Sequence, residues 1–512
     1  MRITARLVLS DSGWADTDCR ISAPLPLAAF YLAVSERPAI SQVLIELRVC
    51  RSQRQAFLLL PLHEKLFSSS VRQPHSALAK DHLRKSGYGG EGVSMDDIKF
   101  TTGLTTAQGA RVAFRGTPFV ERTAPLNQNA LWMRWDRNMV VDAYSDMVAE
   151  LSAIRTAVAM GDMSPLSKYV IAGPDAEAMM DRLIPRDIRK LQVGQIYYAP
   201  WCDENGYVVG DGLVFRMDEN TFRVSADPGF TWWRQHAEGL DLQVTDITDT
   251  YGILTLQGPR SREVLEAATE AGFQELPFSR LAVVTIAGRQ VEILRQGFTG
   301  EHGYELWVKA EDGPTVWDAV EAAGRPFSIR PAGAWALDVA RLEAGLLIVG
   351  YDYTSAGPDH GGAGIQASGK FRASPFDLGL GRLVDFKKSD FIGRTALERL
   401  SKYGQHRQLV GLEIDWKQIA GTGLESEEPG NLRRVRWYPV PVFGGSVEIG
   451  HASSVAWSPT LRKLIGFGHL QQAFGEIGTQ VTLRWEDDGT TRDVAARVVA
   501  LPFHSLRRTA SN

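Results

Sequence analysis

A closely spaced series of turn signals between residues 195 and 227 constrains the fold more than any other feature of the chain. The apolar run IYYAPWCD ends at Glu204-Asn205-Gly206, and an Asn-Gly pair between two β-rich runs is a strong hairpin signal. The returning run YVVGDGLVFRM is followed by a second turn at Asp218-Glu219-Asn220 and by a third run, TFRVSAD. The spacing predicts a three-stranded antiparallel meander over Gln195–Asp227.

A strand, a Gly-Pro turn and a helix follow one another on each side of this meander. On the N-terminal side, Lys168–Ala172 alternates like a strand, and Asp175 is suited to cap the helix that follows. On the C-terminal side, TYGILTLQGPRSREVLEAATEAG has the same order of strand, turn and helix. The repeated order is a hint of two paired α+β units.

The remaining pattern predicts further helices and a C-terminal β domain. Helical apolar spacing predicts a helix over Val140–Ala159 that ends at Met160-Gly161, and a hairpin is centred on Ala287-Gly288. Two more helices are expected over residues 313–323 and 332–345. Residues after about 405 are β-rich with many Gly and Pro turns, which predicts a separate barrel or sandwich. We therefore expect an α+β region at residues 95–400 and a β domain at residues 401–512.

Residues 1–94 differ in pattern from the rest of the chain, with short apolar runs and no sustained helix or strand period. Repeated acidic residues argue against a transit peptide, and a small extra domain is a second alternative. The hypothesis we prefer is a misassigned start, with the natural protein beginning at Met95. Glu91-Gly92 can be encoded by a sequence that resembles a bacterial ribosome-binding site, a short spacer upstream of Met95.

Composition excludes several classes of protein. The 512 residues are 44% hydrophobic and 23% charged, which is ordinary for a globular protein of two to four domains. A net charge of −4 without a long basic run argues against nucleic-acid binding, and no apolar stretch is long enough to span a membrane. The three scattered cysteines fit a reducing cytoplasm, and the lack of HExxH or a Cys/His cluster argues against a metal site.

The first candidate for chemistry is Asp211, which stands between Gly210 and Gly212 inside the apolar run NGYVVGDGLVF. A carboxylate among valines and leucines is costly to bury without a partner. Glycines on both sides let a ligand or another backbone approach closely. The alternative interpretation is an acid at a β-bulge that caps a nearby backbone group, and the spacing alone does not decide between the two.

Two more segments carry candidate residues. In the run FTGEHGYE, a Gly-rich turn leads to a strand that contains an aromatic residue and Glu305. A carboxylate there suits a ligand with two adjacent N–H donors. Glu301 and His302 in that turn are expected to be solvated. In RLEAGL, Gly345 is a candidate helix C-cap, and composition favours an ion pair of Arg341 with Asp338 or Glu343.

Seven segments in order resemble the family of the glycine-cleavage T-protein, or aminomethyltransferase. The family also includes tetrahydrofolate-dependent demethylases that act on dimethylsulfoniopropionate and on methoxylated aromatic acids. The resemblance runs from about residue 115 to 505. The segments are MGDMSPLSKYVIAGPDA, NGYVVGDGLVF, LTLQGPRSREVL, GFTGEHGYELWV, RLEAGLLIVGYD, GLGRLVDFKKSDFIGRTAL and HASSVAWSPTLRKLIGFGHL.

The resemblance implies an α+β, three-domain cloverleaf with tetrahydrofolate in a central channel. Asp211 matches the family's acid near the reacting folate nitrogens and is the predicted catalytic residue. Glu305 matches the acid that grips the pterin, and Phe298 stands where the motif often has Tyr. The full set of predicted cofactor contacts is Glu305, Phe298, Tyr198, Ser225 and Arg341, and the predicted substrate contacts are Trp232 and Asp227.

Three departures from the family pattern point away from glycine cleavage. The glycine-cleavage enzymes carry a ligand-binding arginine four residues before Arg341, where this chain has Leu337. Where those enzymes have two consecutive aspartates, this chain has Gly210-Asp211. The tyrosine-rich tail that follows Pro502-Phe503 in those enzymes is missing. We therefore expect a demethylase that moves a methyl group from a small O-, S- or N-methyl compound to tetrahydrofolate.

Two alternatives stay open. One is the aminomethyltransferase reaction of glycine cleavage. The other is a non-catalytic folate-binding module that partners a flavin-dependent N-methyl oxidase, with the flavin on another chain because this chain has no GxGxxG. Cys202 in WCDENG does not match the reactive cysteine motif of the iron–sulfur assembly relatives.

Overall fold

The computed structural model describes residues 111–359, 370–404, 407–420, 432–487 and 489–505, and strands within residues 3–105. Contacts divide the chain into two compact units. One comprises residues 1–91, 101–112 and 486–490, and the other comprises residues 92–100, 113–485 and 491–512. Met95, where we expect the natural protein to begin, lies outside the described residues.

The first unit contains a four-stranded sheet in the order β2-β1-β3-β4. Its strands are β1 (Ile3–Leu9), β2 (Cys19–Ile21), β3 (Gln42–Val49) and β4 (Gln55–Pro61). The sequence showed no sustained strand period here. β1 nevertheless pairs with β3 in a regular antiparallel register. Backbone hydrogen bonds form this pairing, and the side-chain pattern of the sequence did not predict it.

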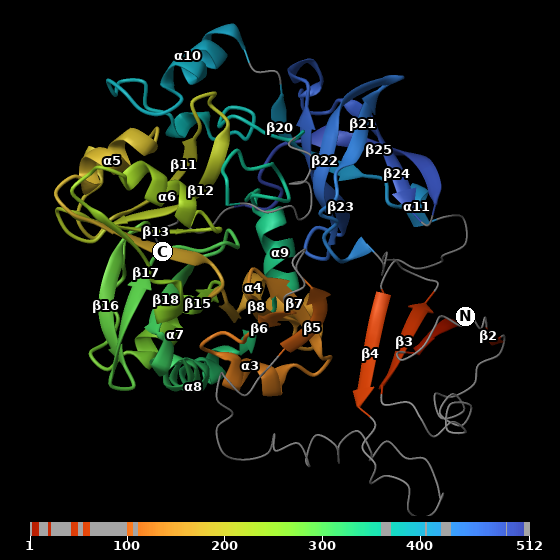
Figure 1. Ribbon diagram of the computed structural model, residues 1–512, viewed down its shortest axis with the longest axis horizontal. Coiled ribbons are helices and arrows are strands. Elements are labelled where there is room, and N and C mark those ends of the chain that lie inside the picture. The colour runs from red at the N-terminus through yellow and green to blue at the C-terminus, as the bar shows by residue number, and fades with distance from the viewer. Residues whose placement is uncertain are drawn as a thin grey trace, which may run out of the picture. The chain divides into compact units, whose positions relative to one another are not determined.

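The predicted meander is confirmed and forms part of a five-stranded sheet in the order β11-β12-β13-β10-β14. Helices α5 (Ala176–Leu183) and α6 (Phe230–Ala237) lie beside it, and Asp175 is the N-terminal residue that flanks α5 as expected (Figure 1). Their apolar side chains and those of the sheet share one hydrophobic core. The strands are β10 (Ser167–Ala172), β11 (Ile196–Cys202), β12 (Val208–Arg216), β13 (Thr221–Ala226) and β14 (Gln243–Asp246).

A second sheet has the order β16-β17-β18-β15-β9-β19 and packs against helices α7 (Ser261–Ala268) and α8 (Gly313–Gly324). The predicted hairpin is confirmed at Ala287-Gly288, where φ is positive at both positions (49° and 71°), as a two-residue type I′ turn requires. The strands are β9 (Val158–Asp162), β15 (Tyr251–Gln257), β16 (Leu281–Ile286), β17 (Arg289–Leu294), β18 (Gly303–Lys309) and β19 (Ile329–Pro331).

The helix predicted over Val140–Ala159 is wrong at both ends. Residues 138–143 are strand β8, the helix α4 covers only Met147–Thr156, and Met160-Gly161 lie in β9. Asp146 begins α4 because its side chain accepts a hydrogen bond from the backbone N–H of Val148. Two buried strands therefore flank a short helix, and their continuous apolar content resembles helical spacing.

Helix α9 (Ala334–Glu343) lies between the two sheets and a closed C-terminal barrel (Figure 1). Gly345 follows α9 with a φ of +72°, which confirms it as the predicted C-terminal glycine. The prediction of two units that each combine helices with a sheet, followed by a C-terminal barrel, is thus confirmed. The barrel strands are β20 (Gln408–Ile414), β21 (Val440–Gly444), β22 (Val447–Ser458), β23 (Lys463–Leu470), β24 (Gln480–Asp487) and β25 (Thr490–Val499).

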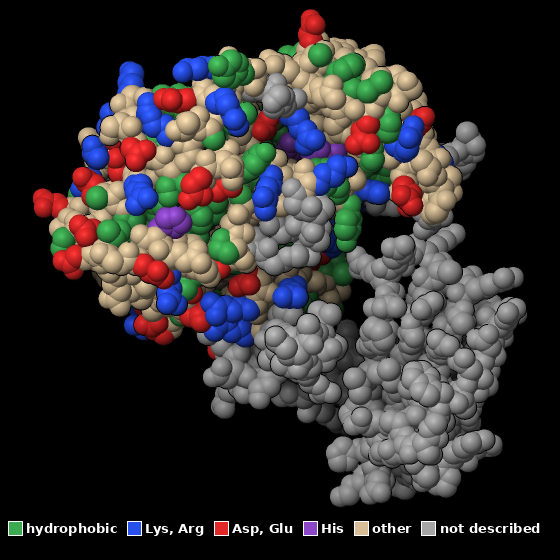
Figure 2. Space-filling model, turned by 45° about the horizontal axis from the view of Figure 1, so that its top comes forward, with side chains coloured by type: hydrophobic (Ala, Val, Ile, Leu, Met, Phe, Trp, Pro, Cys, Tyr) green, Lys and Arg blue, Asp and Glu red, His purple; other side chains and the backbone are tan. Residues whose placement is uncertain are grey.

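Shorter elements complete the described part of the chain. They are β5 (Phe100–Thr105), β6 (Arg111–Phe114), α3 (Val120–Leu126), β7 (Leu131–Trp135), β8 (Asn138–Ala143), α10 (Arg394–Tyr403) and α11 (Lys417–Ala420). Over much of the face drawn in Figure 2, acidic and basic side chains are interspersed. Within the described residues, no helix has the length and apolar character needed to cross a membrane. Those residues also contain no group of three or more His, Cys, Asp or Glu arranged to hold a metal ion.

Candidate active site

The Asp211 carboxyl lies in the middle of β12 and accepts hydrogen bonds from two tyrosine hydroxyls. Tyr198 Oη donates to Asp211 Oδ2 at 2.7 Å, and Tyr353 Oη donates to Asp211 Oδ1. Pro200 of β11 lies opposite Asp211, so Tyr198, two residues from Pro200, projects from the same face of the sheet. Tyr353 comes from the segment that follows α9. The two hydroxyls donate to the carboxyl and so hold it in one position at the wall of the pocket that it lines.

The glycines that flank Asp211 make room for other parts of the protein. A Cβ atom on Gly210 would lie 2.8 Å from Cζ2 of Trp201, and one on Gly212 would lie 2.4 Å from the carbonyl oxygen of Ser225. Gly210 therefore accommodates an indole ring, and Gly212 lets β13 approach. The sequence left open whether a ligand or another backbone needed this space, and at Gly212 it is another backbone.

Asp211 and Asp227 both have raised pKa values. Burial raises the pKa of Asp211 and the charge of Asp352 raises it further, whereas the two tyrosine hydrogen bonds lower it. Burial and the nearby Asp211 carboxyl raise the pKa of Asp227 to about 7. The two acids are therefore more basic than ordinary aspartates, as expected for two carboxyls that share a partly desolvated site.

Asp211, Asp227 and Trp232 line one pocket, which brings together three of the predicted site residues. Trp232 is on α6 and is buried, and Asp359 accepts a hydrogen bond from its backbone N–H at 3.1 Å. Trp201 from β11 also lines the pocket. The pocket thus combines carboxyl groups with two indole rings.

Glu305 lies on β18 opposite Thr255 and is buried, with 7% of its surface exposed. Trp307 Nε1 donates to its Oε2 at 3.4 Å. Burial raises the pKa of Glu305 to about 7, opposed by the Trp307 hydrogen bond and by the charge of Lys168. The Lys168 ammonium is itself fully buried and donates to the carbonyl oxygens of Ser164 and Leu166, both at 2.8 Å. Glu305 is therefore a buried acid with little hydrogen bonding from the protein.

Three of the other four predicted cofactor contacts differ in their surroundings. Phe298 is half-buried and packs against the core that contains Trp307, and Ser225 is buried on β13. Tyr198 bonds Asp211, as described above. The predicted roles of these residues in binding a cofactor stay predictions.

Arg341 is fully buried, and protein acceptors contact each of its three nitrogens. Nε donates to Asp338 at 2.8 Å, Nη1 to Asp352 at 2.7 Å, and Nη2 to Ser454 Oγ at 2.7 Å. The ion pair with Asp338 that composition favoured is confirmed. Glu343, the other partner considered, pairs with Arg155. The contacts of Arg341 give it a structural role between α9 and barrel strand β22.

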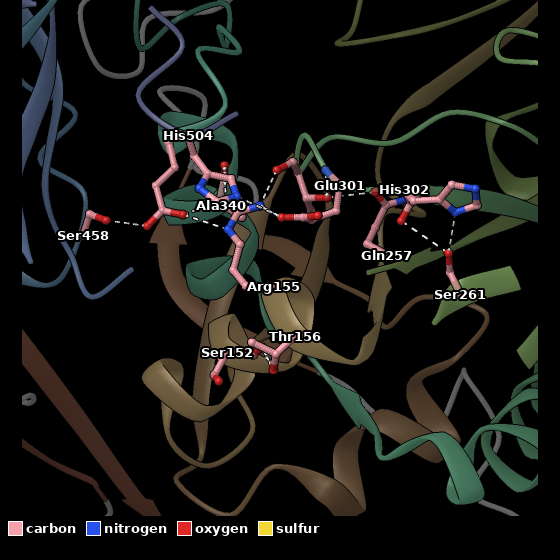
Figure 3. Close-up of polar contacts among 12 residues, drawn as sticks. Ser152, Arg155, Thr156, Gln257, Ser261, Glu301, His302, Ala340, Ser458 and His504 are labelled. Carbon is pink, nitrogen blue, oxygen red and sulfur yellow. Dashed lines mark hydrogen bonds and ion pairs between the residues drawn. The ribbon is translucent and has the colours of Figure 1, made fainter. Parts of the chain in front are cut away.

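The expectation that Glu301 and His302 are solvated is wrong, because only 1% and 4% of their surfaces are exposed. Arg155 Nη1 bonds Glu301 at 3.1 Å, and Glu301 also contacts His504 Nε2 at 3.1 Å (Figure 3). His302 Nδ1 lies 3.1 Å from Ser261 Oγ. The local sequence of a Gly-rich turn predicts exposure to solvent. Here the distant Arg155 and the C-terminal segment that contains His504 cover the turn.

Sequence reasoning did not find Tyr353, Asp359 or Arg155. Tyr353 follows the matched run RLEAGLLIVGYD, so a search for hydroxyl donors near that run could have suggested it. Asp359 and Arg155 carry no local signal, because their partners lie more than a hundred residues away.

Two family models match most of the described chain. The model described as the GCVT N-terminal domain matches residues 123–388, and the one described as the glycine cleavage T-protein C-terminal barrel domain matches residues 407–504. The first covers both sheets and the Asp211 pocket, and the second covers the barrel.

Curated relatives and a solved structure extend this match. An aminomethyltransferase of Thermotoga maritima is 31% identical over 77% of this chain and 99% of its own length. A trimethylamine-oxide aldolase of Ruegeria pomeroyi is 32% identical over 80% of this chain and 51% of its own length. The crystal structure of the glycine cleavage system aminomethyltransferase T of Bartonella henselae has a TM-score of 0.63 at 23% identity. It covers 76% of this chain and 98% of that one, and it supports the fold.

Proposed function

Because the chain belongs to the glycine-cleavage T-protein family of tetrahydrofolate-dependent one-carbon transferases, we propose that it is a demethylase that moves a methyl group from a small methyl donor to tetrahydrofolate. The observation that carries the proposal is the Asp211 carboxyl, which two tyrosine hydroxyls hold at the wall of a pocket. The donor binds in that pocket next to Asp211.

The residues around Glu305 fit tetrahydrofolate. Among the described residues, Trp307 Nε1 is the one hydrogen-bond donor to the buried Glu305 carboxyl, so the acid retains acceptor capacity. An aminopyrimidine ring offers two adjacent N–H donors to such a group. Glu305 would hold the pterin, and Phe298, Tyr198 and Ser225 are its proposed neighbours. Bound tetrahydrofolate supplies the nitrogen that accepts the carbon.

Asp211 acts as an orienting group and proton acceptor in this proposal. Its raised pKa makes it a better base than an exposed aspartate, and Tyr198 and Tyr353 fix its position. Holding the reacting groups in line also lowers the activation barrier, because orientational entropy is lost on binding and not in the reaction step.

Leu337 supports demethylation over glycine cleavage. The glycine-cleavage enzymes have a ligand-binding arginine at this position, whereas Leu337 is 5% exposed and belongs to the hydrophobic core. It packs against Gly161, where an added Cβ would lie 2.9 Å from Leu337 Cδ1. This apolar contact leaves no cation at that point to receive an anionic ligand.

A second candidate function is aminomethyl transfer in glycine cleavage. It is favoured by the relatives that bear the name aminomethyltransferase, of which the one from Thermotoga maritima aligns over 99% of its length. Both candidates use the same acid and the same folate, and they differ in the carbon that is delivered.

The proposal is tested by incubating the protein with tetrahydrofolate and a panel of methoxyaromatic, sulfonium and N-methyl compounds. We expect 5-methyltetrahydrofolate from at least one donor. The aminomethylated carrier protein of glycine cleavage serves as the comparison substrate. Formation of 5,10-methylenetetrahydrofolate from that carrier, with no methyl product from the panel, would replace the proposal by the second candidate.

The role of Asp211 is tested with Asp211→Asn, which keeps the size of the side chain and removes its basicity. We expect kcat to fall by about 10²–10⁴-fold, as for loss of a general base, with folate binding retained. The matched control is Asp218→Asn, an exposed aspartate in the turn that follows the same strand. Turnover that is equal in Asp211→Asn and in the control contradicts the assignment.

A further inference from the structure

A row of side chains crosses the first sheet and begins at Lys168. On β10, Lys168 lies directly opposite Ser225 of β13. The row continues through Leu213 of β12 and ends at Tyr198 of β11. Residues that lie opposite each other in a sheet project from the same face. Lys168 therefore shares a face with Ser225 and Tyr198, which are two of the predicted cofactor contacts.

This face packs against the face of the second sheet that carries Glu305. Glu305 and Trp307 are two residues apart on β18, so their side chains project from the same face. The Trp307 indole lies 5.3 Å from the ring of Phe215, which is two residues after Leu213 on β12. The Lys168 ammonium lies 6.0 Å from the centre of the indole, and the indole Nε1 donates to Glu305. Trp307 is thus close to both Lys168 and Glu305.

Lys168 is a buried cation without an ion pair among the described residues. Its ammonium donates to the carbonyl oxygens of Ser164 and Leu166, both at 2.8 Å, and of Thr248 at 3.4 Å. Carbonyl oxygens satisfy its hydrogen bonds but bring no negative charge, and a buried cation needs a counter-charge to stay ionised. Because the three carbonyls use its three donors, the ammonium is not free to bind a ligand directly.

The charge of Lys168 is coupled to that of Glu305. Burial lowers the pKa of Lys168 to about 7, against the effect of four carboxyls: Asp162, Asp249, Asp246 and Glu305. Burial also raises the pKa of Glu305 to about 7, against the Trp307 hydrogen bond and the Lys168 charge. Near neutral pH the lysine and the glutamate therefore titrate as a pair and not as independent groups.

Glu305 depends on Lys168 more than Lys168 depends on Glu305. Within the described residues, Lys168 provides the one charge that lowers the pKa of Glu305. The Arg223 guanidinium of β13 lies 5.1 Å from the centre of the Trp307 ring, but its Nη1 bonds Glu292 of β17 at 2.6 Å. Without Lys168, only the Trp307 hydrogen bond would favour the ionised form of Glu305.

We propose that Lys168 is a positioning residue that holds Glu305 in its carboxylate form, ready to accept the two N–H donors of a pterin. This inference rests on the proposed function and adds a counter-charge to the proposed folate contact. A carboxylate accepts both N–H groups of an aminopyrimidine, whereas a protonated carboxyl presents one donor in place of one acceptor. Lys168 acts through Glu305, because its own donors are used by carbonyl oxygens.

The inference is tested with Lys168→Gln, whose amide still donates hydrogen bonds but carries no charge. Anaerobic calorimetry measures the binding of tetrahydrofolate, without a methyl donor, between pH 6 and pH 9. Loss of the cation raises the pKa of Glu305, so the affinity at pH 7 should fall about tenfold. Affinity is lost as the pH falls through the pKa of Glu305, and the midpoint of that loss should move upward by about one pH unit.

Lys388→Gln is the matched control for this variant. Lys388 is also buried, and its ammonium donates to backbone carbonyl oxygens, among them that of Ile184 at 2.7 Å. Both variants lose a buried cation, but only Lys168→Gln should move the pH midpoint of tetrahydrofolate binding. A midpoint that is the same in Lys168→Gln and in the control would overturn the proposal.

A double variant separates the electrostatic role of Lys168 from a structural one. In Glu305→Gln the side chain can no longer ionise, so the further change Lys168→Gln should alter the Kd for tetrahydrofolate by less than about twofold. A purely structural lysine would instead weaken binding equally in the unaltered protein and in Glu305→Gln. Equal weakening in the two backgrounds therefore contradicts the proposal.

The unaltered protein provides a test that does not depend on the folding of Lys168→Gln. Tetrahydrofolate binding at pH 7 is measured in phosphate and in Tris, because the difference in heat between buffers of unlike ionisation enthalpy counts the protons released. We expect almost no net release, since a proton that leaves Glu305 stays on Lys168. Release of about half a proton, as from an isolated carboxyl whose pKa equals the pH, would reject the coupling.

Failure of this inference is distinguishable from failure of the proposed function. Tetrahydrofolate binding and methyl transfer that keep their pH profile in Lys168→Gln would reject the role of the lysine and retain the demethylase. The expected dependence of tetrahydrofolate affinity on Lys168, without 5-methyltetrahydrofolate from any donor, would retain the positioning role and reject methyl transfer.

Discussion

Asp211 on β12 and Asp227 just after β13 share one pocket, so the protonation of each depends on the other. Both carboxyls are partly desolvated, and their mutual repulsion raises the cost of ionising both. Ionisation of the pair is therefore completed only as the pH rises through about 7, the pKa of Asp227.

This titration predicts that kcat of the proposed methyl transfer rises with pH. The pKa of Asp227 is about 7, so the carboxyl is largely protonated at pH 6 and ionised at pH 8. The acids of the pocket accept a proton only in their ionised form, so kcat should increase over this window and become constant above it. Turnover measured at pH 6, 7 and 8 gives the comparison.

The variant Asp227→Asn provides the control, because its kcat should be nearly independent of pH in the same window. Other groups act on Asp227 through their charge: Asp211 and Asp136 raise its pKa. Tyr351 and Tyr353 are also coupled to Asp227, and their own pKa values are raised, so they stay neutral in this range. An unchanged pH dependence in Asp227→Asn would assign the titration to Asp211.

Glu305→Gln tests the proposed pterin contact. The change removes the charge of a buried acceptor and keeps its shape, so we expect the Kd for tetrahydrofolate to increase by about 10–100-fold, as for loss of a charged hydrogen bond. Glu311→Gln, an exposed position two residues after β18, is the matched control. Equal affinities in calorimetry would remove Glu305 from the folate site.

At this scale the sequence identified the acids but not their partners. Asp211 and Glu305 are conspicuous as acids in apolar strands, since an acid there is costly unless it has a purpose. Tyr353 is an ordinary tyrosine in the sequence. It lies 142 residues after Asp211, and only folding brings its hydroxyl to that carboxyl.

At the scale of elements, one buried ion cluster joins five segments. Arg155 at the end of α4 contacts Glu301 in the turn before β18 (Figure 3). Arg155 also contacts Glu343 at the end of α9. Ser458 of β22 donates to Glu343, and His504 contacts Glu301. The cluster fixes the turn that leads into the strand of Glu305, so it supports the position of the proposed folate contact.

Arg155→Met should therefore destabilise the protein strongly. Two buried carboxylates lose their partner, and breaking a buried pair costs about 3–5 kcal/mol in the free energy of unfolding. Arg325→Met, which removes an exposed pair with Glu321, should cost about 0–1 kcal/mol. Urea unfolding of both variants gives the comparison, and similar losses in the two would show that the cluster contributes little.

Element boundaries were predictable where turn chemistry marks them. Asn205-Gly206 and Ala287-Gly288 defined two hairpins because glycine adopts a positive φ there. Between Val140 and Ala159 no such marker divides the strand from the helix, so the apolar period alone merged β8, α4 and the start of β9 into one predicted helix.

At the scale of the whole molecule, α9 connects to the barrel through Arg341. Its guanidinium bonds Asp352, and both groups contact Ser454 on β22. The family model for the barrel covers a separate part of the chain from the one for the sheets. Contacts nevertheless place the sheets and most of the barrel in one compact unit.

Ser454→Ala tests this connection. Removal of the hydroxyl leaves the buried Nη2 donor of Arg341 without its acceptor, whereas Asp352 Oδ1 keeps the hydrogen bond from Ser453 Oγ. The free energy of unfolding should therefore fall by about 1–3 kcal/mol. Ser401→Ala on the exposed side of α10 is the control. A single thermal transition at a lower Tm is expected in calorimetry, and an unchanged Tm would contradict the role of this contact.

The sequence by itself determined the family, the order of most strands and helices, and the acids Asp211 and Glu305, because ordered motifs and turn residues act locally. The tertiary structure decided the surroundings of those acids. It joined Tyr198 and Tyr353 at Asp211, buried the turn at Glu301, and set Asp227 beside Trp232. Burial and neighbouring charge come from distant parts of the chain, so the pKa of a carboxyl and the charge of a pocket depend on the fold.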